Sequence, residues 1–233
     1  MTVTIPEGYS APQIGELLEK NGVCSKSDFL LTLNTYDFTY YSLIAAIQED
    51  KNRCYKLEGY LFPDTYNFNL DKPVADAVGV LLRGAESKIN GVFSHPDLTT
   101  DQLVILASLI EKEAAGTEDM RKVSSVFHNR LNAGMRLQSD ATIHYVERYL
   151  KPNLTGDIDR YNSFYNTYKC EALPAGPICN PSVRALRAAA EPAETDYLYF
   201  AADSEGKFYY AATYEEHLRN CEKAGIQTGG GEE

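Results

Sequence analysis

The spacing of apolar positions predicts one buried helix near the middle of the chain. Residues 103–110 leave no continuous polar face, which is typical of a helix with protein on nearly all sides. Thr99 and Gln102 match a capping box at its start, and Gly116 suits the left-handed position just beyond its end. We therefore expect a helix over 99–116 at the centre of the fold.

Shorter elements are predicted on both sides of this helix. Apolar residues at helical spacing, with cap residues at the ends, indicate helices, and alternation between turn residues indicates strands. The predicted helices end before Gly22, cover 25–33, lie within 35–52, cover 74–89, run from an N-cap at Thr117 to 132, start at Ser139, run from an N-cap at Asn180 to 190, and run from Thr213 to before Gly225; the predicted strands are VTI near the start, 197–202 and 207–212.

Helices with a few short strands indicate an α+β fold. The polar stretch QEDKNR before residue 53 suggests a boundary between a small unit over 1–52, which needs something else to complete it, and a larger domain over 53–225. We expect the Gly-rich tail over 226–233 to be disordered.

Glu111 follows the apolar stretch directly, beside the buried surface of the central helix. Burial and the negative end of the helix dipole both disfavour a charged carboxylate, so we expect its pKa to exceed the value of about 4.3 for a free Glu. Such a group is a candidate general acid. The alternative is an ordinary solvated helix end, EKE, and position alone does not separate the two interpretations.

The composition excludes some function classes. A net charge of −11 over 233 residues argues against nucleic acid or an anionic membrane surface as partner. No apolar run is long enough to span a bilayer, and no signal peptide is visible, so we expect a fragment without its anchor or signal. The 17 Tyr and absent Trp suit a polar ligand such as a sugar.

The 5 cysteines show no spacing typical of a metal site, and we expect neither a metal nor a cofactor. Cys170 and Cys179 flank a Pro/Gly-rich loop and could form a disulfide, while Cys24 and Cys54 could pair only if the first segment packs on the next. The alternative is a chain that merely tolerates reduced cysteines.

Several polar and aromatic side chains are candidates to line a ligand cleft. Glu58 and Tyr60 lie in the aromatic block LEGYLFPDTYNF, with core packing as the alternative for most of its rings. The others follow the central helix, where a plain helix cap explains part of the pattern equally well. The candidate cleft residues are Glu58, Tyr60, Asn129, Arg130, Gln138, Asp140 and Asn166.

Five blocks in this order resemble the YceG-like family of endolytic murein transglycosylases: LEGYLFPDTY, LASLIEKEA, VSSVFHNRLNAGMRLQSDATIHY, YNTYKCEALPAGPICNPS and ALRAAAEPAETDYLYF. The resemblance implies that Glu111, the first Glu of the ExE block, is the catalytic acid. It also implies a small, incomplete LysM-like subdomain before a mixed α+β catalytic domain with a buried central helix. Peptidoglycan glycan strands are the implied substrate, and cell-wall synthesis enzymes are possible partners.

The implied reaction cleaves the MurNAc-to-GlcNAc β-1,4 bond outside the bacterial cytoplasmic membrane, to which the full-length protein is expected to be anchored by a single span. One Glu protonates the leaving oxygen and then accepts the proton of the C6 hydroxyl, which closes a 1,6-anhydro ring. No second carboxylate is required, and Glu113 points about 200° away from Glu111. The alternatives are a glycan-binding module without catalysis and a muramidase that uses water.

Overall fold

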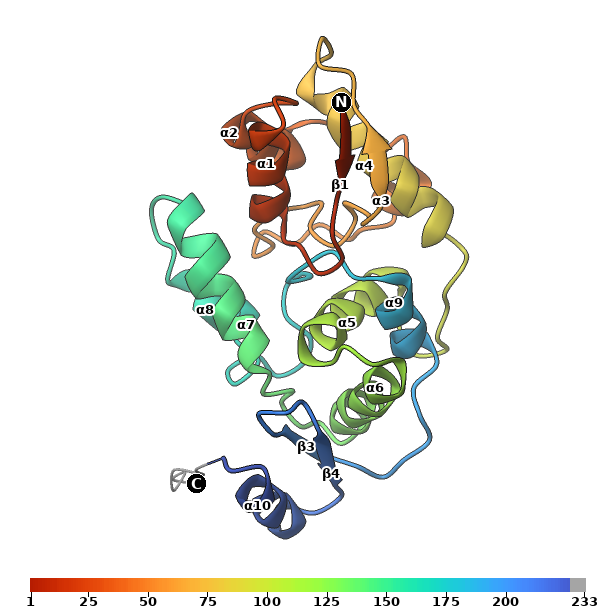
Figure 1. Cartoon of the computed structure of the whole chain (residues 1–233), viewed down its shortest axis with the longest axis vertical. Helices are drawn as coiled ribbons and strands as arrows, with labels where there is room; N and C mark the ends of the chain where they lie inside the picture. The colour runs from red at the N-terminus through yellow and green to blue at the C-terminus, as the bar shows by residue number, and fades with distance from the viewer. Residues whose placement is uncertain (227–233) are drawn as a thin grey trace.

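The structure, a computed structural model, describes residues 1–226 and has the predicted buried helix at its middle (Figure 1). This helix, α5 (Thr100–Glu113), contacts α6 (Thr117–Asn132), α7 (Asp140–Tyr145) and α9 (Val183–Ala190). Every residue from 103 to 110 is buried. The mixed α+β class is therefore confirmed, and the core surrounds α5.

The start of α5 agrees with its sequence signal and its end does not. The Thr99 hydroxyl accepts a hydrogen bond from the Gln102 backbone, and the Gln102 side chain accepts one from the Thr99 backbone, which completes the capping box. The predicted left-handed Gly116 is wrong, because the chain turns extended at Ala114 and Gly116 has a φ of −86°. Gly116 is itself the N-cap of α6, so the predicted cap at Thr117 is also wrong.

The N-terminal unit is a two-stranded sheet beside a group of helices. β1 (Thr2–Thr4) pairs antiparallel with β2 (Thr65–Asn67), so pairing crosses the boundary predicted near residue 52. In this unit α2 contacts both α1 and α4. The helices of the unit are α1 (Ala11–Lys20), α2 (Lys26–Thr35), α3 (Ser42–Ala45) and α4 (Val74–Lys88).

The predicted helix within 35–52 is reduced to the short α3. The Asp37 carboxylate accepts hydrogen bonds from the backbone N–H and hydroxyl of Thr39, at 2.9 and 2.6 Å. A side chain that binds nearby backbone in this way competes with helical hydrogen bonding. Phe38 is still buried at 2% exposure, so the segment contributes to the core without forming a regular helix.

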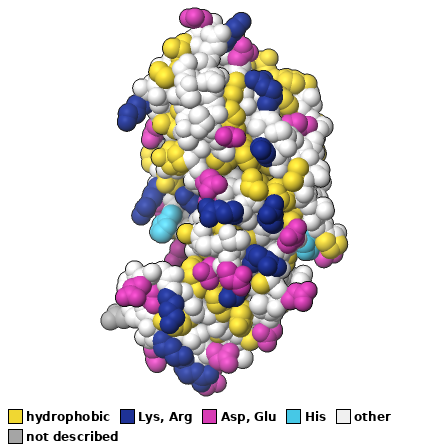
Figure 2. Space-filling model, turned by 45° about the vertical axis from the view of Figure 1, so that its right-hand side comes forward, with side chains coloured by type: hydrophobic (Ala, Val, Ile, Leu, Met, Phe, Trp, Pro, Cys, Tyr) yellow, Lys and Arg dark blue, Asp and Glu magenta, His cyan; other side chains and the backbone are white. Residues whose placement is uncertain are grey.

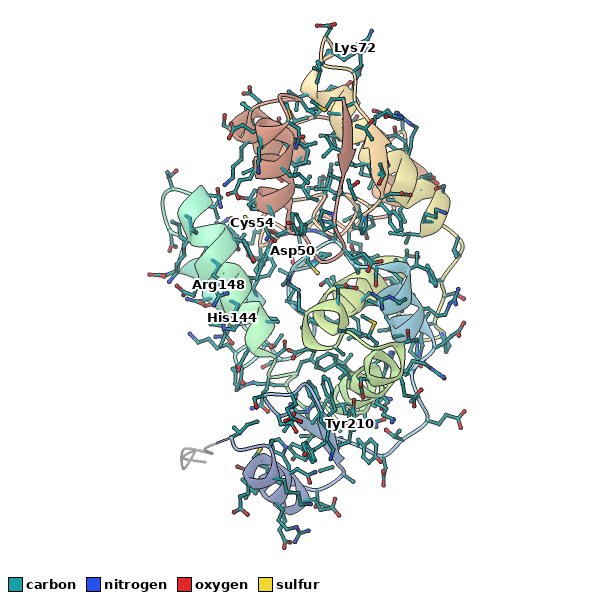
Figure 3. The ribbon with its side chains drawn as sticks, in the orientation of Figure 1. Asp50, Cys54, Lys72, His144, Arg148 and Tyr210 are labelled. Carbon is teal, nitrogen blue, oxygen red and sulfur yellow. The ribbon has the colours of Figure 1, made fainter. Side chains whose placement is uncertain are left out.

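The C-terminal part is the predicted hairpin followed by a helix. β3 (Tyr199–Ala202) pairs with β4 (Phe208–Ala211), and α10 (Tyr214–Lys223), capped by Thr213, packs on both strands. Tyr210, labelled in Figure 3, joins this part to α6 by donating to a carboxylate oxygen of Asp119 at 2.9 Å.

A further helical segment follows α7. The exposed side chains of His144, in α7, and Arg148, in this segment, lie on the outside of the molecule (Figure 3). The segment consists of a π-helical turn (Val146–Leu150), a 3-10 turn (Lys151–Asn153) and α8 (Arg160–Tyr165).

Glu58 and Asn180 form a buried polar junction between the N-terminal unit and the rest. The Glu58 carboxylate accepts hydrogen bonds from Ala11 N, Asn180 Nδ2 and Tyr145 Oη at 2.9, 2.9 and 3.0 Å. Asn180 also donates to the Tyr9 carbonyl at 2.9 Å. The predicted N-cap at Asn180 is therefore wrong, because its side chain is used here, and Ser182 caps α9 instead.

The predicted disulfide between Cys170 and Cys179 is also wrong, because all 5 cysteines have free thiols. Cys179 is buried and its Sγ donates to the Ser108 carbonyl at 3.3 Å. Cys170 instead contacts the Ser163 carbonyl at 3.4 Å. The two thiols thus bond to different parts of the chain, and the loop between them is held by packing and hydrogen bonds.

The surface is mixed in charge on the face shown in Figure 2, where basic and acidic side chains are interspersed. Among residues 1–226, no helix is long and apolar enough to cross a membrane. The tail over 226–233 is expected to be disordered, and all of it except Ile226 lies outside the described residues.

The Glu58 junction predicts a specific pH dependence of stability. Burial raises the pKa of Glu58 to about 7, although its hydrogen bonds and Arg53 oppose the rise. The protonated form therefore stabilises the fold fully below pH 4.5, and this contribution is lost as pH rises through 7. Relative to Glu58→Gln, wild type should lose up to roughly 3 kcal/mol of unfolding free energy between pH 5 and pH 8.

Urea unfolding of both proteins at the two pH values measures this difference. Glu205→Gln, at an exposed position in the hairpin turn, is the control and should show no comparable change. An equal gap between wild type and Glu58→Gln at both pH values would contradict the prediction.

Candidate active site

A cavity of about 350 Å³ opens at the C-terminal end of α5, beside the hairpin. It gathers three of the predicted cleft residues and the second glutamate of the EKE sequence. The residues that line it are Glu113, Arg130, Leu137, Gln138, Asp140, Tyr168, Phe200 and His217. Polar and apolar side chains are thus combined in one concave site, as in pockets that bind small polar ligands.

Glu113 is the acidic group that α5 delivers to this cavity. Its carboxylate accepts a short hydrogen bond from the Ser139 hydroxyl, at the N-cap of α7. Burial raises the pKa of Glu113 above the ordinary value for glutamate; the Ser139 hydrogen bond opposes this and the charge of Asp140 adds to it. A carboxyl group that keeps its proton to higher pH is suited to act as a general acid.

Glu111 lies on the opposite side of α5. Its Oε2 accepts hydrogen bonds from the backbone N–H and the hydroxyl of Ser182, at 3.0 and 2.5 Å. Ser182 is the N-cap of α9, where the helix dipole favours negative charge. A Cβ atom on Gly8 would lie 3.5 Å from Glu111 Cγ, so the N-terminal segment passes close by. Glu111 thus joins α5 to α9 and is not among the residues that line the cavity.

Arg130 forms part of the cavity wall, and its Nε and Nη1 donate to other groups of the chain. Its guanidinium donates to the carbonyls of Leu198, Arg136 and Leu137 at 2.6, 3.0 and 3.0 Å, and to Gln138 Oε1 at 3.0 Å. The guanidinium carbon also lies 5.1 Å from the centre of the Tyr199 ring. Arg130 therefore ties α6 to the extended segment and to the hairpin.

Gln138 has a left-handed backbone, with a φ of 53°, which few residues other than glycine adopt. Its backbone N–H donates to the Thr167 carbonyl at 3.2 Å, and its side chain is held by Arg130. The strain is offset by these contacts, and the exposed Gln138 side chain is kept at the cavity.

Asp140 and Tyr168 form the open side of the cavity. The Tyr168 hydroxyl donates to Asp140 Oδ1 at 2.8 Å, and both side chains are exposed. Asn166, another predicted residue, is 9% exposed and its Oδ1 accepts a hydrogen bond from the Tyr168 backbone at 2.9 Å. Asn166 therefore positions Tyr168 and does not line the cavity.

Three other predicted cleft residues lie away from the cavity, so their assignment to the cleft is corrected. Glu58 and Tyr60 are 0% and 1% exposed, and no ligand reaches them in this conformation. Tyr60 instead donates to Asp101 Oδ1 at 2.6 Å, at the start of α5. Asn129 donates to the carbonyls of Thr195 and Tyr197, both at 2.9 Å, and so holds the segment before the hairpin.

The sequence did not indicate Leu137, Tyr168, Phe200 or His217 as site residues. Phe200 and His217 come from the hairpin and from α10, and only the folded chain brings them to α5. Tyr168 stands in the noted YNTY block, which was the one available signal. Within residues 1–226, no group of three His, Cys, Asp or Glu is arranged to hold a metal ion.

Comparisons with known proteins place this geometry in a family. A model of the YceG-like family matches residues 1–223. The endolytic murein transglycosylase of Streptococcus pneumoniae serotype 2 is 34% identical over 241 residues, which are 94% of this chain and 44% of that protein. The protein of the same name from Bacillus subtilis is 34% identical over 231 residues, 95% of this chain and 64% of that protein.

A solved structure is similar as well. The crystal structure of a yceG-like protein from Listeria monocytogenes matches with a TM-score of 0.79 and 34% sequence identity, over 94% of this chain and 75% of that one. The chain therefore spans about half to two thirds of the length of the curated relatives, at 44% and 64%.

The hydrogen bonds of Arg130 predict a structural role for this residue. Arg130→Lys keeps the charge, but the lysine ammonium cannot donate to all of the acceptors that the guanidinium reaches. Buried carbonyls therefore lose their donors. We expect a loss of about 2–3 kcal/mol in unfolding free energy, measured by urea unfolding. Arg136→Lys, at an exposed position, is the matched control and should change stability by less than about 0.5 kcal/mol. Equal effects of the two substitutions would contradict this role.

Proposed function

Because the chain belongs to the YceG-like family, we propose that it carries the catalytic part of an endolytic murein transglycosylase. The proposed substrate is the glycan strand of peptidoglycan, cut within the strand at the MurNAc-to-GlcNAc bond. The observation that carries the proposal is the cavity in which a glutamate of raised pKa stands among hydrogen-bonding side chains.

We assign the acid to Glu113, whereas the family resemblance alone led to Glu111. Glu113 lines the cavity and has its pKa raised by burial, while Glu111 is engaged by two donors of Ser182. For the two glutamates to exchange roles, Glu113 would have to leave Ser139 and Glu111 would have to leave Ser182. The assignment of Glu111 stays a prediction, and the proposal favours Glu113.

The proposed reaction uses one carboxyl group twice. Protonated Glu113 gives its proton to the glycosidic oxygen as the bond from this oxygen to C1 breaks, and positive charge develops at C1. The resulting carboxylate accepts the proton of the C6 hydroxyl of the same sugar, and that oxygen bonds to C1. The products are a 1,6-anhydro end and a free hydroxyl, Glu113 is protonated again, and no water is consumed.

A muramidase is the second candidate, because Asp140 lines the same cavity as Glu113. A second carboxylate of this kind can hold the attacking water in a glycoside hydrolase. However, one Asp140 oxygen accepts the Tyr168 hydroxyl, which leaves only part of the group available for this role. A glycan-binding module without catalysis would not require the raised pKa of Glu113.

The location and partners follow from the proposed substrate. Murein lies outside the cytoplasmic membrane, so we place the activity on the extracytoplasmic face of the bacterial membrane. Enzymes that synthesise the strands are the proposed partners. We also retain a LysM-like assignment for the N-terminal unit, supported by its small sheet of β1 and β2 beside α1 and α2.

The assignment of the acid predicts different outcomes for the two glutamates. Glu113→Gln should lower the rate of glycan cleavage roughly 10²–10⁴-fold, because Gln has no proton to transfer. Glu111→Gln, the matched control on the same helix, should keep most of the activity and lose some stability through Ser182. Single-turnover cleavage, together with thermal unfolding, measures both effects. The reverse pattern would return the role to Glu111.

The chemistry of the product ends separates a transglycosylase from a muramidase. We expect new ends that are lighter than a hydrolytic product by one water and have no reducing group, because the C6 hydroxyl attacks C1. Mass analysis before and after borohydride treatment checks this. New MurNAc ends that gain two hydrogens on reduction would show hydrolysis and would support a water-positioning role for Asp140.

A further inference from the structure

Three of the residues that line the cavity differ in chemical character from Glu113 and Asp140. The partly exposed Phe200 supplies apolar surface together with Leu137, which is 2% exposed, and the half-buried His217 lines the same cavity. Phe200 is fixed by an edge-on contact with Phe127, with ring centres 6.0 Å apart. The cavity therefore combines acidic groups, one of which is the proposed catalytic group, with apolar side chains and an imidazole.

The imidazole of His217 is held in place by the rings of Tyr199 and Tyr214 and by the Cys221 thiol, whose Sγ lies 3.6 Å from Nε2. Its ring lies 5.1 Å from the ring of Tyr199, at an angle of 22°. The Tyr199 ring also contacts the guanidinium of Arg130, 5.1 Å from its centre, and the ring of Tyr214, at 5.8 Å between ring centres. Burial and the charge of Arg130 both lower the pKa of His217. At neutral pH the ring is therefore uncharged, with one nitrogen donating and one accepting.

This combination suits a neutral group with an amide and a methyl. The acidic groups of Glu113 and Asp140 disfavour an anion in the cavity, and the guanidinium of Arg130 already donates four hydrogen bonds to protein acceptors. The apolar surface of Leu137 and Phe200 favours a small alkyl group. An acetamido group on the carbon next to C1 would enter the cavity when the glycosidic oxygen lies at Glu113.

We propose that Leu137, Phe200 and His217 form a pocket for the 2-acetamido group of the sugar whose bond to C1 is cut. The methyl packs on Leu137 and Phe200, and His217 hydrogen-bonds the amide. His217 is then a specificity-determining residue that α10 contributes to the site. The inference rests on the proposed function, since that function supplies the sugar.

The test measures binding and cleavage separately. Labelled glycan strands are prepared in their natural N-acetylated form, after removal of the acetyl groups, and after chemical re-N-acetylation as a control for damage. Dissociation constants are measured in a Glu113→Gln background, so that no strand is cut. We expect the N-acetylated and re-N-acetylated strands to bind roughly 10- to 100-fold more tightly than the free-amine strands.

Adding His217→Ala should reduce this preference to nearly none, mainly by weakening the binding of N-acetylated strands. His217→Asn is a smaller change at the same position and should also lose the preference, because its shorter side chain does not reach the amide. His144→Ala, at an exposed site on α7, is the control and should keep the full preference (Figure 3). Thermal unfolding of each variant checks that the fold is kept.

Two results would overturn the pocket: a preference that survives in both folded His217 variants, or no preference in the Glu113→Gln background. Cleavage by the wild-type chain is assayed in parallel. A chain that prefers N-acetylated strands without cutting them would refute the transglycosylase and leave the pocket standing. A chain that cuts strands with no such preference would refute the pocket and leave the transglycosylase standing.

Discussion

The burial of α5 on nearly all sides is the constraint on which the site depends. A helix with residues 103–110 buried cannot rotate about its axis without exposing apolar side chains, and exposure costs about 25 cal/mol for each Å². Its last turn is therefore fixed in orientation. Because Glu111 and Glu113 are two residues apart, they must point to opposite sides, one to Ser182 at α9 and the other to Ser139 at the cavity.

Two buried polar groups transmit this constraint to the rest of the chain. Glu58 joins the start of α1 to Tyr145 in α7 and to Asn180 before α9, so the N-terminal unit is attached through a carboxylate that has no access to water. Arg130 connects α6 by hydrogen bonds to the segment at Gln138 and to the start of the hairpin. Losing either group would leave several buried partners unpaired, which explains why these polar residues stand inside the fold.

The sequence predicted those features that depend on local spacing. The capping box at Thr99, the end of α6 at Asn132 and the hairpin all follow from patterns within a few residues, and the structure has them. The polar residues were harder to interpret, since Glu58 and Asn180 carry the same side chains whether they meet a ligand or each other across 122 positions. Their partners are set by tertiary packing, and a single sequence does not contain that information.

The dependence on tertiary packing also explains why the sequence did not show which of the two glutamates, Glu111 or Glu113, lines the cavity. Spacing correctly indicated that they diverge, but it could not say which side of α5 holds a cavity, because Tyr168, Phe200 and His217 arrive from distant parts of the chain. Once these side chains are in place, Asp140 has a further effect beyond lining the site. Burial is the main cause of the raised pKa of Glu113, and the charge of Asp140 adds to it, while the Tyr168 hydroxyl donates to one Asp140 oxygen. Burial and an acidic neighbour both favour the protonated form of Glu113, which suits a single carboxyl group that works first as acid and then as base.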